Sequence, residues 1–402
     1  MTAITTDPQL DAAAEPLRHQ LAEQLAAAGN LPAGWEQAVA TVPRHRFVPG
    51  FYLPREQRAA NGLTIWEPVT AVTDPGRWLT TIYTDETLIT QFDNDEPDWA
   101  SPQPRTGGAP SSSSTLPSLV LQMWHDAGIE EGMTVLEVGT GTGYSTALAC
   151  VRLGSDAITT VEVDPHRFGQ AAKALYGSGY EPTGATADGL YGYWPTAPFD
   201  RVVAACSVRS IPAAWLAQTR SGGKILTTLS GWMWGNARVL LTVEDCGTAR
   251  GSLLPGTISF MAARGQLPPT AGNPGHWDAM ASDLPERTTR HDPACVDGAT
   301  VESFTGKFLA QLAAPTARLE IWTDTVRLID VTDGSFALLT RRDGAWYVRQ
   351  AGPVCLWDKV EDALDAWDQA SRPGPEEFEM VIDGQQHIRH PGTPGLSFTL
   401  PG

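Results

Sequence analysis

The chain has 402 residues, 42% of them hydrophobic and 18% charged, with a formal net charge of −18. This length allows two or three domains, each with a sizeable core. An acidic surface would repel a phosphate backbone, so composition argues against a nucleic-acid partner. The same surface suits solubility alone or a basic peptide partner, and composition does not choose between them.

The cysteines and the first residues set further bounds. Five cysteines are present, and none of them forms a C-x-x-C pair. An odd number without that spacing predicts neither a disulfide framework nor a zinc site, and it favours a reducing compartment. Residues 1–8 lack a basic stretch followed by an apolar one, and no run approaches ~18 apolar residues. These features predict a soluble cytoplasmic protein with no membrane segment and no metal.

The N-terminal stretch is predicted to be helical. Leucines that recur every four residues indicate an amphipathic helix over 11–28, and a second, short helix is expected over 35–42. The segment 43–49 has a proline at each end, which favours an extended connection over a helix. Its His45 and Arg46 are expected either in a salt bridge at the rim or in contact with substrate carboxylates.

Residues 51–110 read as a lid or rim. Strand-like pieces occur at 78–83 and 88–92, and an acidic turn follows at 93–98. The run Ser111-Ser-Ser-Ser-Thr-Leu-Pro117 then precedes an apolar stretch that predicts a helix with proline in its first turn. Hydroxyls at a helix N-terminus supply caps and can hold an anion there, and a flexible serine linker is the other interpretation.

The middle of the chain alternates strands and helices. Such alternation predicts an α/β fold: a doubly wound, Rossmann-like parallel sheet covered by helices. The expected strands lie at 135–138, 157–163, 184–189, 199–206 and 222–229, and the expected helices at 144–153, 165–176 and 212–218.

After about residue 234 the alternation stops, and an additional α+β domain is expected. A long loop rich in proline, glycine and aspartate is expected over 265–297. Asp343-Gly344 between two strand-like pieces is a hairpin signal. The expected strands lie at 236–244, 256–261, 319–329, 335–340 and 346–349, and the expected helices at 301–313 and 357–370.

A glycine-rich turn stands at the centre of the alternation. Gly139, Gly141 and Gly143 follow the first strand and open a helix, which is the local pattern of a nucleotide-cofactor site. Glu162 lies 21 residues after Gly141, at the end of the next strand. An acidic residue there accepts hydrogen bonds from a ribose diol, and both NAD and S-adenosylmethionine carry one.

Two features favour S-adenosylmethionine over NAD. A dinucleotide site has the pattern G-x-G-x-x-G, whereas the glycines here stand at every second position. Glu137 stands two residues before the first glycine, where a carboxylate would repel a pyrophosphate. It suits a cofactor that carries a cationic ammonium and sulfonium. Asp188, at the end of the third expected strand, is placed to meet an adenine amino group.

The motifs together resemble the protein-L-isoaspartate O-methyltransferase family. Its Ser-x-Pro, helix and V-L-E-I-G-T-G-S-G-Y are similar to Thr115-Leu-Pro117 and Val135–Tyr144, and its V-P-R-x-x-F-V is similar to Val42–Pro49. The similarity covers about residues 40–230 and continues, in order, through Thr160-Val-Glu162, Ala187-Asp-Gly189, Pro198-Phe-Asp200, Ile211-Pro212, Gln218 and Gly222-Gly223.

This resemblance implies a site for methyl transfer to a carboxylate. The family's active-site serine aligns with Thr115, behind four serines, so the hydroxyl that meets the substrate is Ser113, Ser114 or Thr115. Hydroxyls orient one carboxylate oxygen while the other attacks the methyl group. The residues implied to hold S-adenosylmethionine are Glu137, Gly139, Thr140, Gly141, Gly143, Tyr144, Glu162, Val163, Asp188 and Gly189.

The serine run and the long C-terminal part look like the branch of the family found in ribosomal peptide maturation, beside ATP-grasp ligases (graspetides) or lanthipeptide enzymes. That likeness implies a modified, cyclised precursor peptide as partner, whose methylated aspartate collapses to an aspartimide. Repair of isoaspartate in damaged proteins is the alternative. The implied division by role is a helical and rim segment at 1–110, a cofactor-binding core at 111–235, and a substrate-recognition domain at 236–402.

Overall fold

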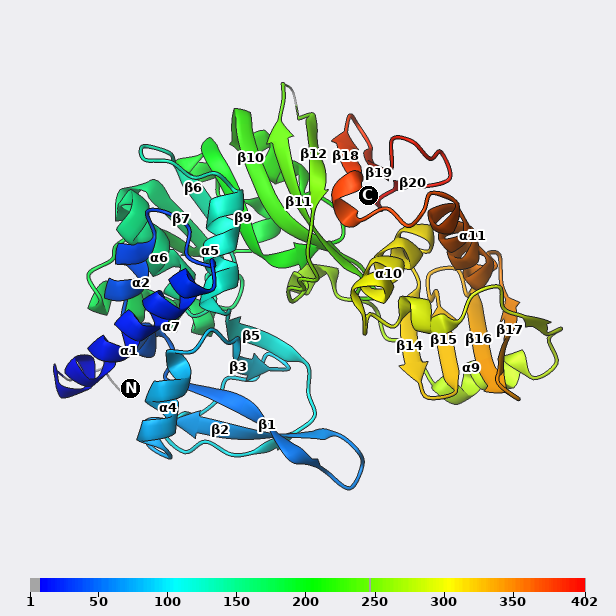
Figure 1. Ribbon diagram of the computed structural model, residues 1–402, viewed down its shortest axis with the longest axis horizontal. Coiled ribbons are helices and arrows are strands. Elements are labelled where there is room, and N and C mark those ends of the chain that lie inside the picture. Colours follow the sequence, from blue (N-terminus) through cyan, green and yellow to red (C-terminus); the bar gives the residue numbers. More distant parts are fainter. Residues whose placement is uncertain (1–7, 246, 402) are drawn as a thin grey trace. The chain divides into compact units, whose positions relative to one another are not determined.

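The computed structural model describes residues 8–245 and 247–401, which fold into two compact units (Figure 1). The first unit comprises Met1–Ala205 with Gln218–Arg220, and the second comprises Cys206–Ala217 with Ser221–Gly402. Within the described ranges, no helix combines the length and the apolar character that crossing a membrane requires. The three-part division by role stays a prediction.

The first unit contains four of the five strands that the sequence predicts for a parallel sheet. The fifth, expected over 222–229, belongs to the second unit and pairs antiparallel with the strand that follows it. Four strands lie in the order β9-β6-β7-β8, and all neighbours are parallel. Every residue of β6 and β7 is buried, as expected for a parallel sheet that is covered on both faces. The strands are β6 (Val135–Val138), β7 (Ile158–Glu162), β8 (Thr183–Thr186) and β9 (Phe199–Val208), and the helices α6 (Tyr144–Leu153) and α7 (Pro165–Gly177) follow β6 and β7.

The N-terminal helices form as predicted, with one correction. Helix α1 (Pro8–Ala27) buries Leu21 and Leu25 and contacts α2 (Glu36–Thr41). The segment after α2 is not extended, because α3 (Arg44–Phe47) forms one helical turn there. The prolines at 43 and 49 restrict only themselves and the residues before them, so Arg44–Phe47 are free to turn.

The rim segment is a five-stranded antiparallel sheet in the order β4-β2-β1-β3-β5. The prediction of a strand over 78–83 is wrong, since α4 (Pro75–Ile82) occupies it. Asp74 caps that helix by accepting the Arg77 N–H at 3.0 Å, and Pro75 stands in its first turn. The strands are β1 (Gly50–Arg58), β2 (Thr64–Thr70), β3 (Leu88–Phe92), β4 (Arg105–Thr106) and β5 (Pro110–Ser114), and α5 (Pro117–Asp126) comes next.

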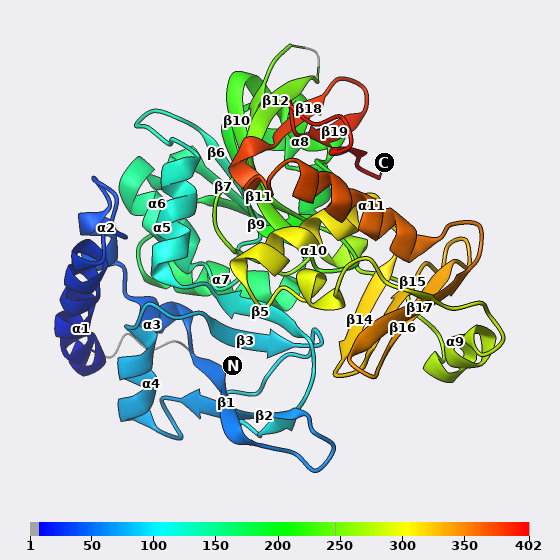
Figure 2. The same ribbon diagram turned by 45° about the vertical axis from the view of Figure 1, so that its right-hand side comes forward.

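The second unit contains two antiparallel sheets (Figure 2). One runs β10-β11-β12-β18-β19-β20, and the piece at 256–261 is not a strand of it, because β12 ends before that segment. Its strands are β10 (Thr219–Ser230), β11 (Asn236–Val243), β12 (Ala249–Leu254), β18 (Glu379–Ile382), β19 (Gln386–Arg389) and β20 (Ser397–Thr399), and α8 (Ala213–Gln218) precedes them.

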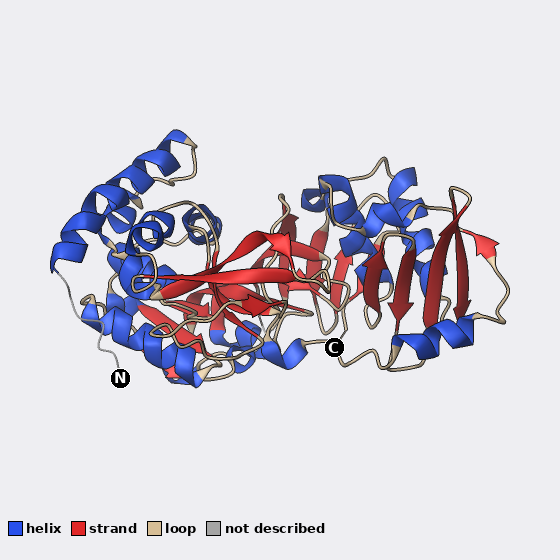
Figure 3. Cartoon of the chain, turned by 90° about the horizontal axis from the view of Figure 1, so that it is seen from below, coloured by secondary structure: helices blue, strands red, loops and turns tan. Residues whose placement is uncertain are grey.

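The other sheet runs β13-β17-β16-β15-β14, and α9 and α11 both contact β16 and β17 (Figure 3). The expected single strand over 319–329 is a hairpin of two strands. The expected loop over 265–297 contains a helix, α9. The elements are α9 (Pro274–Ala281), β13 (Arg287–Thr288), α10 (Val301–Ala313), β14 (Arg318–Trp322), β15 (Thr325–Ile329), β16 (Phe336–Arg342), β17 (Ala345–Ala351) and α11 (Leu356–Gln369).

Candidate active site

The predicted cofactor residues lie after three neighbouring strands of the first unit. The parallel strands β6, β7 and β8 end at the same edge of the sheet, where open α/β sheets bind their ligands. We call the residues gathered there the cofactor edge. It consists of Glu137, Gly139, Thr140, Gly141, Gly143, Tyr144, Glu162, Val163, Asp188 and Gly189.

The glycine turn has the backbone that its sequence predicts. Gly139, Gly141 and Gly143 have φ values of 95°, 56° and 88°, a region that side chains other than glycine strain to adopt. A Cβ on Gly143 would also lie 3.2 Å from that of Ala171. Below the turn, the Thr140 and Thr160 hydroxyls are hydrogen-bonded at 2.8 Å. The turn is therefore supported by a hydrogen bond beneath it, and its three glycines leave the backbone open to a ligand.

Glu162 braces this turn with its carboxylate. Its Oε2 accepts the Gly141 N–H at 2.9 Å, and its Oε1 accepts the Asp164 N–H at 3.1 Å. Each carboxylate oxygen has a second lone pair, so both can still accept a hydroxyl of a ribose. The next side chain, Val163, is 40% exposed and places apolar surface beside the carboxylate.

Glu137 lies deeper than a simple ligand-facing acid. Its Oε2 accepts from the hydroxyls of Thr146 and Thr160, and the side chain is buried. Burial raises the pKa of this carboxyl, and the hydroxyls around it oppose the rise. Within the described part of the chain, no donor meets Oε1 with hydrogen-bond geometry. A buried acceptor without a donor fits a cofactor that brings an ammonium group.

The remaining cofactor-edge residues differ in how accessible they are to a ligand. Asp188 is exposed and accepts the Leu190 N–H at 3.0 Å. A Cβ on Gly189 would lie 2.3 Å from Val138, so only glycine fits there. Tyr144 opens α6, but its buried ring packs 6.2 Å from the Phe47 ring, away from open surface. A direct cofactor contact by Tyr144 is the least supported of these predictions.

The hydroxyl residues form a strand and its exit, which we call the hydroxyl segment (Ser113–Thr115). Strand alternation buries Ser112 and Ser114, whereas Ser113 and Thr115 are half-buried. The Ser113 carbonyl oxygen lies 3.6 Å from the position that a Cβ on Gly141 would take. The structure therefore brings the hydroxyl segment directly against the glycine turn.

Two interpretations of the serine run are wrong. It is not a flexible linker, since β5 pairs with β3. It does not cap α5 either, because the N-cap is Leu116, which makes no side-chain cap. The Leu116 and Ser118 N–H groups are instead accepted by Thr87 and Asp85, at 3.1 and 2.8 Å. These side chains come from the α4–β3 connection and do the work of a cap.

Sequence reasoning missed the residue that holds the hydroxyl segment. The Arg44 side chain is fully buried and hydrogen-bonded to both Ser114 and Thr115. The signal was present in the segment 42–49, but spacing alone does not show what an arginine reaches. Arg46 forms the expected salt bridge with Asp11, and His45 is hydrogen-bonded to the same carboxylate at 3.0 Å, although His45 is buried and not at a rim.

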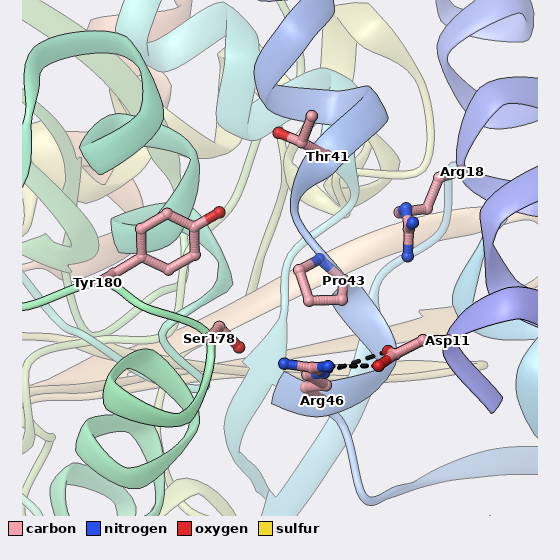
Figure 4. Close-up of a pocket in the computed structure, with 7 residues that line it drawn as sticks. All are labelled: Asp11, Arg18, Thr41, Pro43, Arg46, Ser178 and Tyr180. Carbon is pink, nitrogen blue, oxygen red and sulfur yellow. Dashed lines mark hydrogen bonds and ion pairs between the residues drawn. The ribbon is translucent and has the colours of Figure 1, made fainter. Parts of the chain in front are cut away.

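The first unit also has an open pocket that is lined by no residue of the cofactor edge or the hydroxyl segment. It has a volume of about 300 Å³ and lies against α1, α3 and the end of α7 (Figure 4). Its charged groups are largely engaged, since Arg46 is paired with Asp11 and Arg18 donates to the Ala40 carbonyl at 3.2 Å. The residues that line it are Asp11, Arg18, Thr41, Pro43, Arg46, Ser178 and Tyr180.

Comparison with known proteins agrees with this site. Residues 84–233 match the protein-L-isoaspartate(D-aspartate) O-methyltransferase family. The protein-L-isoaspartate O-methyltransferase of Thermococcus onnurineus is 31% identical over 153 residues, which are 37% of this chain and 68% of that protein. The chain belongs to this family. A Methanococcus maripaludis enzyme of the same name is 38% identical over 106 residues, 26% of this chain and half of its own length.

A solved structure titled protein-L-isoaspartate O-methyltransferase shares the fold over 93% of this chain and 99% of its own. The TM-score is 0.52 and the sequence identity is 18%, so this likeness concerns the fold alone. Its coverage extends well past the family match at 84–233. At least one protein of that name therefore shares the fold beyond the family match.

The family fixes the class of enzyme: an S-adenosylmethionine-dependent carboxyl O-methyltransferase. The residues of the cofactor edge fit that cofactor. Glu162 retains lone pairs for a ribose, Val163 offers apolar surface for adenine, and the Glu137 carboxylate has an oxygen without a donor. The contribution of each residue to binding stays a prediction.

Proposed function

We propose that this enzyme methylates the side-chain carboxylate of an aspartate in a ribosomally made, cyclised peptide. The observation that carries the chemistry is the close approach of the hydroxyl segment to the glycine turn, where the Ser113 carbonyl oxygen lies 3.6 Å from the position that a Cβ on Gly141 would take. A methyl donor held at the turn would face neutral hydroxyls. Such hydroxyls orient a carboxylate without neutralising it, which keeps the attacking oxygen nucleophilic.

The reaction needs no general base, because the carboxylate is already ionised at neutral pH. S-adenosylmethionine, when bound, supplies an electrophilic methyl group on a sulfonium. The half-buried hydroxyls of Ser113 and Thr115 hold one substrate oxygen, so that the other is directed at the methyl group. Ser114 is left out of this proposed contact, since its side chain is 2% exposed and its hydroxyl lies against Arg44 at 3.3 Å. The enzyme thus contributes proximity and orientation.

The ester then leads to an aspartimide without further chemistry from the enzyme. The backbone nitrogen of the following residue attacks the ester carbonyl and closes a five-membered ring. The nitrogen loses its proton, and methanol departs with it. The resemblance of the serine run to the peptide-maturation branch supports this choice of substrate. The C-terminal part no longer supports it, because a structure titled protein-L-isoaspartate O-methyltransferase shares the fold there.

Repair of isoaspartyl residues is the second candidate. It is favoured by the relatives, which are named protein-L-isoaspartate O-methyltransferases. It is also favoured by the family match at 84–233, which includes the hydroxyl segment and the cofactor edge. The acidic turn at 93–98 is partly used internally. Asp93 is paired with Arg105, and Glu96 with Arg167.

Three synthetic peptides distinguish the two substrates. One carries an isoaspartyl residue, one is closed by a side-chain lactone or lactam and keeps a free aspartate, and one is its linear form. We expect methyl transfer to the cyclised peptide with a kcat/KM at least about tenfold above that for the isoaspartyl peptide. We also expect loss of one water from the cyclised peptide after ring closure. Turnover of the isoaspartyl peptide alone would establish repair instead.

A further inference from the structure

Arg44 is a buried cation that is bonded almost entirely to backbone. Its Nη1 donates to the carbonyls of Ile82 and Thr84 at 2.8 and 2.9 Å, and its Nη2 donates to that of Glu86 at 3.0 Å. The side chain is 0% exposed. It forms no ion pair with any described carboxylate, and Asp85 and Glu86 act on its charge only at longer range.

The same guanidinium reaches the hydroxyl segment from behind. Nη2 donates to the Ser114 carbonyl at 3.3 Å and to the Thr115 carbonyl at 3.1 Å, and the Ser114 hydroxyl accepts from Nε at 3.3 Å. Arg44 therefore holds the peptide groups on both sides of the Thr115 Cα atom. Arginine suits this task because its planar guanidinium carries five N–H donors in a fixed geometry and stays protonated in a protein.

This arrangement sets the direction of the Thr115 backbone. The C=O and N–H of a trans peptide point in opposite directions. A Ser114 carbonyl aimed at Arg44 therefore turns the Thr115 N–H away from the guanidinium. In the described part of the chain, neither that N–H nor the hydroxyls of Ser113 and Thr115 has a hydrogen-bond partner. Three donors are left free on a segment whose backbone is locked.

We propose that Arg44 is the positioning residue for the substrate carboxylate. It fixes the hydroxyl segment against the glycine turn, and its positive charge, which is paired with no described carboxylate, lies behind the peptide groups that meet the substrate. A direct ion pair would weaken the carboxylate as a nucleophile, because the negative charge disappears in the transition state. Acting through oriented peptide groups, Arg44 attracts and aligns the carboxylate and leaves its attacking oxygen free. This inference rests on the proposed carboxyl methylation.

Arg201 provides a matched control. It is 8% exposed and, like Arg44, is bonded to carbonyls, with Nε at 2.6 Å from Ala127 and Nη2 at 2.9 Å from Gly128. These carbonyls lie at the far end of α5 from the hydroxyl segment. Arg44→Lys and Arg201→Lys both keep the charge and lose the fork, so both should lower stability.

The experiment compares three measurements on the full chain: KM for the peptide that wild type methylates, Kd for S-adenosylmethionine, and amide hydrogen exchange of residues 113–116 and 118. For Arg44→Lys we expect KM to rise at least about tenfold, Kd to stay within about twofold, and the amides to exchange at least about tenfold faster. For Arg201→Lys we expect no change in any of the three beyond about twofold. Equal changes in the two variants would overturn the inference.

Two further arms keep the test decisive. If Arg44→Lys does not fold, Thr87→Val removes the exposed hydroxyl that accepts the Leu116 N–H. That variant should raise KM severalfold and speed exchange at Leu116, and unchanged values would count against positioning. If wild type methylates none of the peptides, the proposed function fails. Amide exchange of residues 113–116 and 118, which needs no substrate, then still decides whether Arg44 holds the segment.

Discussion

The cofactor edge and the hydroxyl segment meet at one site but are built in opposite ways. At the cofactor edge, the carboxylate of Glu162 accepts backbone N–H groups. At the hydroxyl segment, the cation of Arg44 donates to backbone carbonyls. The partners of Glu162 lie within 21 residues, whereas Arg44 reaches 70 and 71 residues along the chain. The two sides of the site can therefore be disturbed separately.

The largest expected effect is on the cofactor side. Glu162→Ala removes the acceptor predicted for the ribose and the brace on Gly141, so we expect Kd for S-adenosylmethionine to rise about a hundredfold. Calorimetric titration measures this, and circular dichroism checks the fold. Glu181→Ala, which removes an exposed carboxylate in the same unit, is the control and should bind as wild type does. Undiminished binding by Glu162→Ala would refute the assignment.

The next effect belongs to the hydroxyl side. The double variant Ser113→Ala, Thr115→Val removes both half-buried hydroxyls and keeps the side-chain volumes close to the original. We expect kcat/KM for the peptide to fall about thirtyfold with the cofactor Kd unchanged. Steady-state rates at saturating cofactor give the first value and calorimetry the second. A parallel loss of cofactor binding would mean that the two segments do not divide the work as described.

A pH effect on stability tests the buried histidine that follows Arg44 in the chain. Burial lowers the pKa of His45 from 6.5 to about 4, and its ring is hydrogen-bonded to Tyr83 and Asp11. Below pH 6.5 the unfolded chain binds the proton and the folded chain resists it. Stability should therefore fall by about 1–2 kcal/mol between pH 7 and pH 5. Urea unfolding across this range measures the slope, and His45→Gln should flatten it.

The smallest effect separates neighbouring serines. Ser114→Ala removes a hydroxyl that accepts from Arg44, while both carbonyl bonds of Arg44 to the segment remain. We expect a loss of about 1 kcal/mol in unfolding free energy and a kcat/KM within about threefold of wild type. A loss as large as that of the double variant would show that Ser114 meets the substrate after all.

The sequence predicts the cofactor edge better than it predicts the hydroxyl segment. The cofactor edge depends on features with a short-range signature: buried apolar strands, alternate glycines and an acid at the end of the next strand. All of β6 and α6 was located to the residue. The turn itself requires glycine, as the positive φ values at 139, 141 and 143 show. Sequence spacing suffices to predict such a pair, because only one helix and one strand separate the glycine turn from Glu162.

The hydroxyl side was predicted less well, because tertiary contacts decide it. The serines looked like caps, but Thr87 and Asp85 supply that function from another segment. The choice between Ser113, Ser114 and Thr115 needed strand alternation, which appears only once β5 pairs with β3. Residues 78–83 looked like a strand because of their β-branched and aromatic content. The N-cap at Asp74 and Pro75 in the first turn outweigh that β propensity, so the segment is helical.

The central claim is that methyl transfer ends on a carboxylate held between these two segments. Tandem mass spectrometry of the peptide product, with wild-type enzyme and S-adenosylmethionine, locates the added methyl group. The account predicts a methyl ester, or the ring formed from it, at an aspartate-derived carboxylate, and no product with Glu162→Ala at a cofactor concentration that saturates only wild type. A methyl group on a nitrogen or a hydroxyl of the peptide would contradict it.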